Sequence, residues 1–208
     1  MQINEHGFWE NDTDEGHGVD PLLAEALAKF FLEKAKASFY LNVCDLGCGT
    51  GYYTDVLNKL DDGNEDISFA CHGYDGNPYT REFCIPSQRD NIGFLDLTLP
   101  TSLTLSFDWA LSLEVGEHIP VEFEQTFLNT LCKVKKGVIL SWAIPGQGGD
   151  GHVNCRDNIY IILQMKKRGF TIDEDATKLL RNAASPYPET GWWFKNTLMV
   201  FNKESNGL

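Results

Sequence analysis

The stretch V-C-D-L-G-C-G-T-G-Y, residues 43–52, decides the fold of this chain of 208 residues. It reads as a buried strand that ends at an acidic residue and then turns through glycines at positions 47, 49 and 51. Glycine has no Cβ, so it adopts positive φ easily and lets a ligand contact the backbone. A strand, a glycine turn and a helix start form a corner that binds nucleotides. The spacing is not the G-x-G-x-x-G of dinucleotide-binding proteins, which argues against a nicotinamide oxidoreductase.

Composition restricts the class of protein. An apolar share of 42% and a charged share of 23% are typical of globular domains. No apolar run approaches the roughly 18 residues of a membrane helix, and the N-terminus has no secretory signal pattern. The net charge of −13 repels polyanions and anionic membranes, so nucleic acid and membranes are disfavoured as partners.

The cysteines and the length of the chain indicate its compartment and its number of domains. The six cysteines form no C-x-x-C pair, which favours free thiols in a reducing compartment, the cytoplasm. The length fits a single domain over 1–208, with an N-terminal cap segment over 1–19 and a core over 20–202. The last five residues, E-S-N-G-L, are expected to be frayed.

Strands and helices alternate along the chain. Asp20 suits an N-cap and Pro21 the first helical position after it. The patterns predict strands over 42–46, 68–74, 92–95, 107–113, 137–143, 170–172 and 197–202, and helices over 19–39, 51–60, 120–132 and 158–168. This alternation implies parallel pairing through right-handed crossovers. The sequence therefore predicts a doubly wound α/β fold: a seven-stranded, mostly parallel sheet with helices on both faces.

Three aspartates, Asp45, Asp75 and Asp96, follow the first three predicted strands. Ligands of open α/β sheets bind beyond the carboxyl ends of the strands. A carboxylate at Asp75 suits a ribose because it can accept from both hydroxyls, and Asp96 could accept from an adenine amino group. Each aspartate alone could be a turn or cap residue, but three in this order favour a nucleotide-like ligand.

The fourth strand leads into L-E-V-G-E-H-I-P, which holds Glu114, Glu117 and His118. At i, i+3 and i+4 these residues would share one face of a helical turn. Two carboxylates and an imidazole suit Mg²⁺, Mn²⁺ or Zn²⁺. The alternative is a capping cluster, in which the acidic side chains only favour the helix dipole.

A glycine-rich loop, W-A-I-P-G-Q-G-G-D-G-H-V-N-C-R over 142–156, follows the fifth strand. His152 could supply a fourth metal ligand, with Asp150 or Asn154 in support. It could instead be a general base, since an imidazole near pH 7 suits deprotonation of a hydroxyl. The plainer alternative is a surface loop whose glycines merely turn the chain.

The acid-x-G-x-G-x-G pattern and the aspartates at successive strand ends resemble those of class I S-adenosylmethionine-dependent methyltransferases. The resemblance covers about residues 20–202. It implies a Rossmann-like sheet whose last strand is antiparallel. It implies that S-adenosylmethionine is the methyl donor. It also implies a donor site made of Asp45, Gly47, Cys48, Gly49, Gly51, Asp75, Asn77, Asp96, Leu97 and Leu113.

The pattern E-x-x-E-H with a distant histidine resembles the metal site of small-RNA 2′-O-methyltransferases and ubiquinone-pathway O-methyltransferases. The likeness implies a divalent cation held by Glu114, Glu117, His118 and His152. It gives catalytic roles to His152, His118 and Asp150.

The whole chain looks most like small sugar O-methyltransferases of large algal (chlorella) viruses. That likeness implies a viral protein that methylates a sugar hydroxyl of a glycan, possibly rhamnose, in the host cytoplasm. The alternatives are a methyltransferase of another small metabolite and a non-catalytic, S-adenosylmethionine-binding partner subunit. The absence of N-P-P-Y after the fourth strand argues against amino groups as targets.

Aromatic residues precede the first core helix, in the segment over 6–20. Phe8 and Trp9 could close over the donor, and His17 could line the acceptor site. Aromatic faces suit the apolar C–H patches of sugar rings. Trp9 could equally do no more than pack the segment onto the core.

Overall fold

The computed structural model describes residues 3–10, 13, 17–60, 67–187 and 191–204. The expected cap segment, 1–19, is therefore described in part. Of the five C-terminal residues expected to be frayed, only Glu204 is described, and the other four lie outside the described residues.

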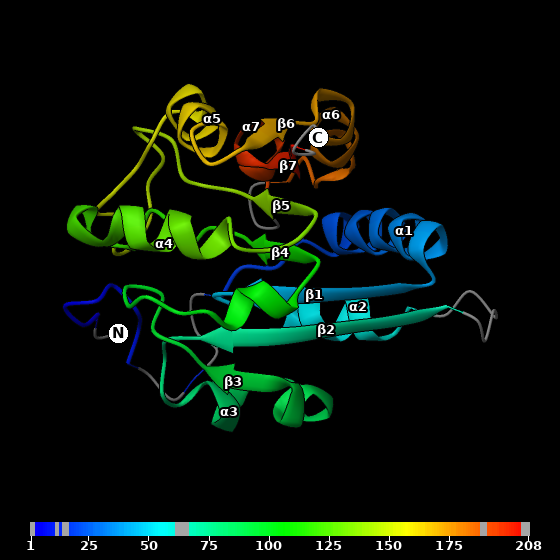
Figure 1. The fold of residues 1–208 in the computed structure, drawn as a ribbon. Coiled ribbons are helices and arrows are strands. Elements are labelled where there is room, and N and C mark those ends of the chain that lie inside the picture. Colours follow the sequence, from blue (N-terminus) through cyan, green and yellow to red (C-terminus); the bar gives the residue numbers. More distant parts are fainter. Residues whose placement is uncertain (1–2, 11–12, 14–16, 61–66, 188–190, 205–208) are drawn as a thin grey trace.

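The strands of the described residues form one sheet in the order β3-β2-β1-β4-β5-β7-β6 (Figure 1). Their bounds are β1 Tyr40–Leu46, β2 Ser68–Asp75, β3 Ile92–Phe94, β4 Trp109–Ser112, β5 Gly137–Leu140, β6 Phe170–Ile172 and β7 Met199–Lys203. Strands β1 to β5 pair in parallel, and β7 is antiparallel to both β5 and β6. This confirms the predicted doubly wound, mostly parallel sheet of seven strands with an antiparallel last strand.

The strand order reverses between β1 and β4. The chain proceeds outward from β1 through β2 to β3, and then returns to the other side of β1 as β4. Such a reversal leaves a crevice at the carboxyl ends of the two central strands, where open α/β sheets bind their ligands. The fold therefore places the glycine turn after β1 beside the acidic turn after β4.

Helices connect the strands, with bounds α1 Pro21–Ser38, α2 Tyr52–Asn58, α3 Thr80–Phe83, α4 Glu124–Leu131, α5 Asn158–Lys166, α6 Glu174–Ala183 and α7 Phe194–Thr197. The Asp20 carboxylate caps α1, accepting from the backbone N–H groups of Leu22 and Leu23 at 3.0 and 3.1 Å. Helix α4 begins later than predicted because Val121–Phe123 forms a 3-10 turn. None of the described helices is both long and apolar enough to span a membrane.

Helix α6 lies between β6 and β7, where no helix is expected from the sequence patterns. Asp173 caps it by accepting from the N–H of Ala176 at 3.0 Å. The helix fully buries only Thr177 and Leu180. Glu174–Ala183 is strongly amphipathic, so the helix carried a periodic signal that the sequence reasoning missed.

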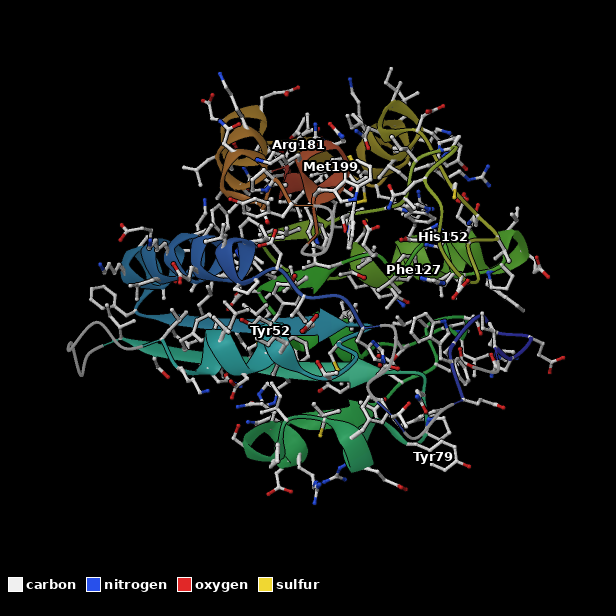
Figure 2. All side chains as sticks on the ribbon, turned by 180° about the vertical axis from the view of Figure 1, so that it is seen from behind. Tyr52, Tyr79, Phe127, His152, Arg181 and Met199 are labelled. Atoms are coloured by element: carbon white, nitrogen blue, oxygen red, sulfur yellow. The ribbon has the colours of Figure 1, made fainter. Side chains whose placement is uncertain are left out.

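Side chains alternate between two cores along the strands, as a period of two requires. Val43 of β1 packs with Phe31 of α1 on one face, and Leu46 packs with Phe127 of α4 on the other. Phe127 shares the second core with Met199 of β7 (Figure 2). Helices thus cover both faces of the sheet, as predicted.

Candidate active site

The glycine turn after β1 brings its backbone close to other segments. Gly47 and Gly49 have φ angles of 77° and 51°, a region that side chains with a Cβ rarely adopt. A Cβ on Gly47 would lie 2.4 Å from Cγ2 of Val115, and one on Gly49 would lie 2.6 Å from Nδ1 of His17. Both positions therefore require glycine.

A cavity of about 470 Å³ opens at the carboxyl ends of β1, β2 and β4. This volume is within the range of small-molecule sites. It is lined by eight of the ten expected donor-site residues: Asp45, Gly47, Cys48, Gly49, Asp75, Asn77, Leu97 and Leu113. Gly51 and Asp96 are not among the lining residues.

Asp75 ends β2 at the edge of this cavity. One of its carboxylate oxygens accepts from the N–H of Gly49 at 2.9 Å, and the other accepts from the N–H of Asn77 at 2.8 Å. Because a carboxylate has about four acceptor positions, it can still accept from two ribose hydroxyls. The two backbone donors thus fix the orientation of the carboxylate, and its remaining acceptor positions stay available to a ligand.

Asp45 lies at the back of the cavity and is 3% exposed. Its Oδ2 accepts from the hydroxyl of Thr54 at 2.9 Å. Burial raises the pKa of Asp45 to about 7, the Thr54 hydrogen bond opposes the rise, and the charge of Asp75 adds to it. An acid with this pKa responds to a cationic ligand near neutral pH.

Asp96 lies beyond β3, where the resemblance assigns it to the adenine amino group. Its carboxylate instead contacts Nδ1 of His6 at 2.5 Å and accepts from the N–H and hydroxyl of Thr98 at 2.9 and 2.6 Å. Its neighbours Leu95 and Leu97 line the cavity. In this structure Asp96 anchors the N-terminal segment next to the cavity. Gly51 likewise has a structural position as the N-cap of α2.

Residues 114–118 form a turn and not the helical turn that their spacing suggests. Glu114 adopts a φ of 53°, in the left-handed region. Its carboxylate accepts from Nε2 of Gln147 at 2.7 Å and from the hydroxyl of Thr197 at 3.2 Å. Burial raises the pKa of Glu114, and hydrogen bonds, from Ser141 and Gln147 among others, oppose the rise. The capping alternative is wrong for this turn, because neither glutamate lies in the first turn of a helix.

Glu117, His118 and His152 come together as a candidate metal site. One potential ligand atom of each lies within 4.8 Å of the other two. Glu117 is completely buried, and neither of its carboxylate oxygens has a hydrogen-bond partner in the part of the chain that the structure describes. Burial and the charge of Glu114 raise the pKa of Glu117 well above its usual value. A buried carboxylate without a donor is costly, and a cation would remove that cost.

The two histidines supply neutral nitrogen ligands to the same place. Their ring centroids are 5.0 Å apart, at an interplanar angle of 82°. Burial, and then the charge of His152, lower the pKa of His118 to about 4, so its imidazole is neutral at pH 7. Two imidazoles and one carboxylate fit Zn²⁺ or Mn²⁺ better than Mg²⁺, which prefers oxygen ligands. Three of the four expected ligands thus fit a cation, whereas the carboxylate of Glu114 is held by Gln147 and Thr197 and lies outside the group.

The glycine-rich loop after β5 forms one wall of the cavity. Gln147, Asp150 and His152 line the cavity, and Asp150 is exposed at its rim. Gln147 is a site residue that the sequence reasoning missed, although its position between two of the loop's glycines was a signal. The loop is therefore more than a surface turn, since it brings His152 to Glu117 and His118.

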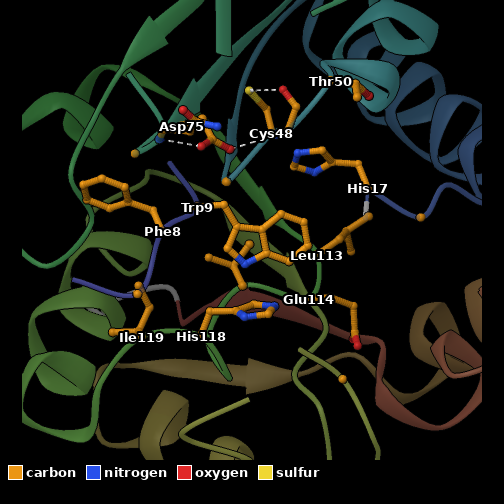
Figure 3. Close-up of a pocket in the computed structure, with 18 of the residues that line it drawn as sticks. Phe8, Trp9, His17, Cys48, Thr50, Asp75, Leu113, Glu114, His118 and Ile119 are labelled. Atoms are coloured by element: carbon orange, nitrogen blue, oxygen red, sulfur yellow. Dashed lines mark hydrogen bonds between the residues drawn. The ribbon is translucent and has the colours of Figure 1, made fainter. Parts of the chain in front are cut away.

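The N-terminal segment covers the cavity. Phe8 packs against Gly76, where a Cβ would lie 2.6 Å from its ring. The indole of Trp9 lies 5.2 Å from the ring of His17 and 5.8 Å from that of His118. Figure 3 shows Trp9 between the donor corner and the His118 side of the cavity. All four aromatic residues line the cavity. His17 lies against Gly49 of the donor corner, and not on the acceptor side where the sequence reasoning placed it.

No family model and no curated protein sequence matches the chain. Among solved structures it is similar to magnesium protoporphyrin IX methyltransferase from Synechocystis PCC 6803 with bound SAH, with a TM-score of 0.60, 17% identity, and coverage of 88% of this chain and 82% of that one. It is also similar to small RNA methyltransferase HEN1 (TM-score 0.58, 15% identity, 100% of this chain and 27% of that one). A third similar structure is that of the [4+2]-cyclase SpnF, with a TM-score of 0.58, 15% identity, and coverage of 98% of this chain and 88% of that one.

Identities this low establish the fold alone. The cyclase among the similar structures shows that this fold does not fix the reaction, which depends on the residues of each site. The sheet order, the glycine corner and these likenesses agree. The chain therefore has the Rossmann-like fold of the S-adenosylmethionine-dependent methyltransferases.

Proposed function

We propose that this chain is an S-adenosylmethionine-dependent O-methyltransferase that acts on a hydroxyl of a vicinal diol, such as that of rhamnose in a glycan. One observation carries the proposal. His118 and His152 line the same cavity as Asp75 and the glycine turn. A donor corner and a cation-binding cluster that share one cavity suit methyl transfer to a cation-held oxygen.

The donor half of the cavity would bind the nucleoside and the cationic sulfur. The glycine turn lets the ligand contact the backbone, and Asp75 offers both carboxylate oxygens to the ribose hydroxyls. Asp45 faces the same cavity with an acid that ionises near neutral pH, which favours a positively charged donor. Leu97 and Leu113 would pack against the apolar surfaces of the ligand.

Methyl transfer is an in-line displacement, so the acceptor oxygen must be aligned with the methyl group and the sulfur. A bound cation would lower the pKa of the acceptor hydroxyl and hold two vicinal oxygens. Glu117, His118 and His152 would hold that cation, and His152 is the alternative general base. Asp150 at the rim could orient a further hydroxyl, and Trp9 would keep water out of the reaction zone.

A sugar is the acceptor that the surroundings favour. The net charge of −13 repels a polyanion such as the small RNA named for HEN1. The indole of Trp9 offers an aromatic face, which suits the C–H patches of a sugar ring. The resemblance to algal-virus sugar methyltransferases supports the same class, and the six free cysteines support the cytoplasm as the place of action.

The test is to incubate the purified protein with S-adenosylmethionine and a panel of rhamnose-containing oligosaccharides, small diols and RNA, and to read the products by mass spectrometry. The same reactions are run with a chelator and after addition of Mg²⁺, Mn²⁺ or Zn²⁺. We expect methylated sugar that disappears in chelator and returns with metal. Methylated RNA alone would contradict the sugar acceptor, and undiminished turnover in chelator would contradict the cation. Donor binding without any product would support the partner-subunit alternative.

A further inference from the structure

Glu124, the first residue of α4, is a buried carboxylate with an unusually large set of donors. It is 2% exposed. It accepts from Tyr160 Oη at 2.5 Å, Arg156 Nε at 2.7 Å, Gln125 Nε2 at 3.0 Å and Asn154 Nδ2 at 3.2 Å. Burial alone would raise the pKa of Glu124, but the hydrogen bonds from Tyr160, Arg156 and Asn154 outweigh it and lower the pKa. Glu124 is therefore ionised at neutral pH.

Three of these donors lie in the segment that directly follows His152. Asn154, Arg156 and Tyr160 all come from the connection between β5 and α5, or from the first turn of α5. The guanidinium of Arg156 also lies 4.8 Å from the ring centroid of Tyr160. One carboxylate on α4 thus bonds three side chains of this segment.

The backbone of the same segment is bonded to the candidate cation site itself. The N–H groups of Val153 and Asn154 both donate to the carbonyl of Glu117 at 2.9 Å. The indole N–H of Trp142 donates to the carbonyl of Asn154 at 2.6 Å. His152 precedes this fixed point by one residue. Its distance from the other two ligands therefore depends on how firmly Asn154 and Arg156 are held.

We propose that Glu124 is a positioning residue, which fixes His152 relative to Glu117 and His118 and thereby sets the affinity of the site for a divalent cation. This inference rests on the proposed function, because it takes the three residues to be cation ligands. Without the carboxylate charge, Arg156 and Asn154 lose their shared acceptor. The loop that carries His152 then gains freedom that cation binding must remove.

The test compares cation binding by the wild-type protein and by Glu124→Gln. Calorimetry with Zn²⁺ and Mn²⁺ gives the affinity, and the visible absorption of bound Co²⁺ reports its coordination geometry. We expect the Kd of Glu124→Gln to rise by about 10- to 100-fold, the range found when groups that orient metal ligands are removed. Glu124→Asp keeps the charge and should recover part of the loss, and Tyr160→Phe, which removes one donor, should have a smaller effect.

Asp55 offers a matched control. It is also a buried carboxylate, 5% exposed, and it accepts from Lys59, Ser87 and Gln88 at 2.5, 2.8 and 3.0 Å. Asp55 does not line the cavity. Asp55→Asn should lower the melting temperature as Glu124→Gln does, but it should leave the Kd for the cation and the Co²⁺ spectrum unchanged.

The outcomes separate this inference from the proposed function. A wild-type protein that binds no cation would overturn the cation role and this inference together. If the wild-type protein binds a cation and Glu124→Gln binds it with the same Kd, this inference is overturned and the proposed function stands. If Glu124→Gln does not fold, Tyr160→Phe and Arg156→Lys carry the same test, and unchanged affinities in both would count against it.

Discussion

The two halves of the cavity are built in different ways. The donor half consists of a glycine backbone and of carboxylates whose partners are present: Asp45 accepts from Thr54, and Asp75 accepts from two backbone N–H groups. The acceptor half centres on Glu117, whose buried oxygens have no partner among the described residues. The donor half is complete without a ligand, whereas in the acceptor half the described residues give the Glu117 carboxyl no hydrogen bond, and Nε2 of His152 lies 4.0 Å from its Oε1.

The largest effect is expected from Glu117→Gln. Removal of the carboxylate should abolish cation binding and lower methyl transfer about a thousandfold, because a catalytic cation contributes several kcal/mol. The melting temperature of the cation-free protein should not fall, since Glu117 has no described donor to lose. Single-turnover assays and thermal melts check both statements. A transfer rate close to that of the wild type would show that the acceptor half works without this ligand.

Gly49→Ala should damage the other half. The new Cβ would lie 2.6 Å from His17 and would need a φ of 51°, a strain of about 1–2 kcal/mol. It would also occupy space next to the donor, so we expect the Kd for S-adenosylhomocysteine to rise about tenfold or more. Calorimetry with that ligand and, separately, with Mn²⁺ should show loss of donor binding only. Equal loss of both affinities would mean that the two halves are not independent.

The pH dependence of donor binding should follow Asp45. Its pKa of about 7 in the free protein means that the acid is largely neutral at pH 6 and ionised at pH 8. A positively charged donor favours the ionised form and lowers its pKa, so binding releases a proton. Affinity should therefore increase with pH, by up to about tenfold between pH 6 and 8. Titrations across this range test it, and Asp45→Asn should remove the slope. If the affinity of Asp45→Asn for the donor still increases with pH, another group causes the pH dependence.

The smallest effect is expected where the halves meet, at Trp9. Its indole lies between the rings of His17 and His118. Trp9→Ala should raise the KM for a sugar acceptor about five- to tenfold, in line with the loss of one aromatic contact of about 0.5–1.5 kcal/mol. The donor Kd should change less, and Trp9→Phe should recover most of the acceptor affinity. Steady-state kinetics with each substrate varied in turn separate the effect on the acceptor from the effect on the donor. A larger change for the donor would make Trp9 part of the donor half.

The same contrast explains what could be predicted from the sequence. Glycine spacing and an acid at the end of a strand are local patterns, so the glycine corner, Asp75 and the sheet that carries them were within reach of sequence reasoning. The spacing of Glu114, Glu117 and His118 is also local, but it is compatible with either a helix or a turn. Only tertiary packing selects the turn and orients the Glu114 carboxylate toward Gln147 and Thr197.

Contacts between distant segments were out of reach for the same physical reason. Asp96 follows the third strand as expected, yet its carboxylate contacts His6, which lies 90 residues earlier in the chain. Nothing in the neighbouring sequence marks that pairing. Glu124 and Arg156 likewise meet because α4 and the loop after β5 lie on the same face of the sheet, and a sequence pattern does not record that distance.

The most direct measurement is anomalous diffraction from crystals grown with S-adenosylhomocysteine and Mn²⁺ or Zn²⁺. The account predicts an anomalous peak bonded to Glu117, His118 and His152, together with the nucleoside in the cavity beside Asp75 and the glycine turn. An empty cluster with the nucleoside bound would contradict the cation-assisted mechanism. A nucleoside bound elsewhere would contradict the assignment of the donor site itself.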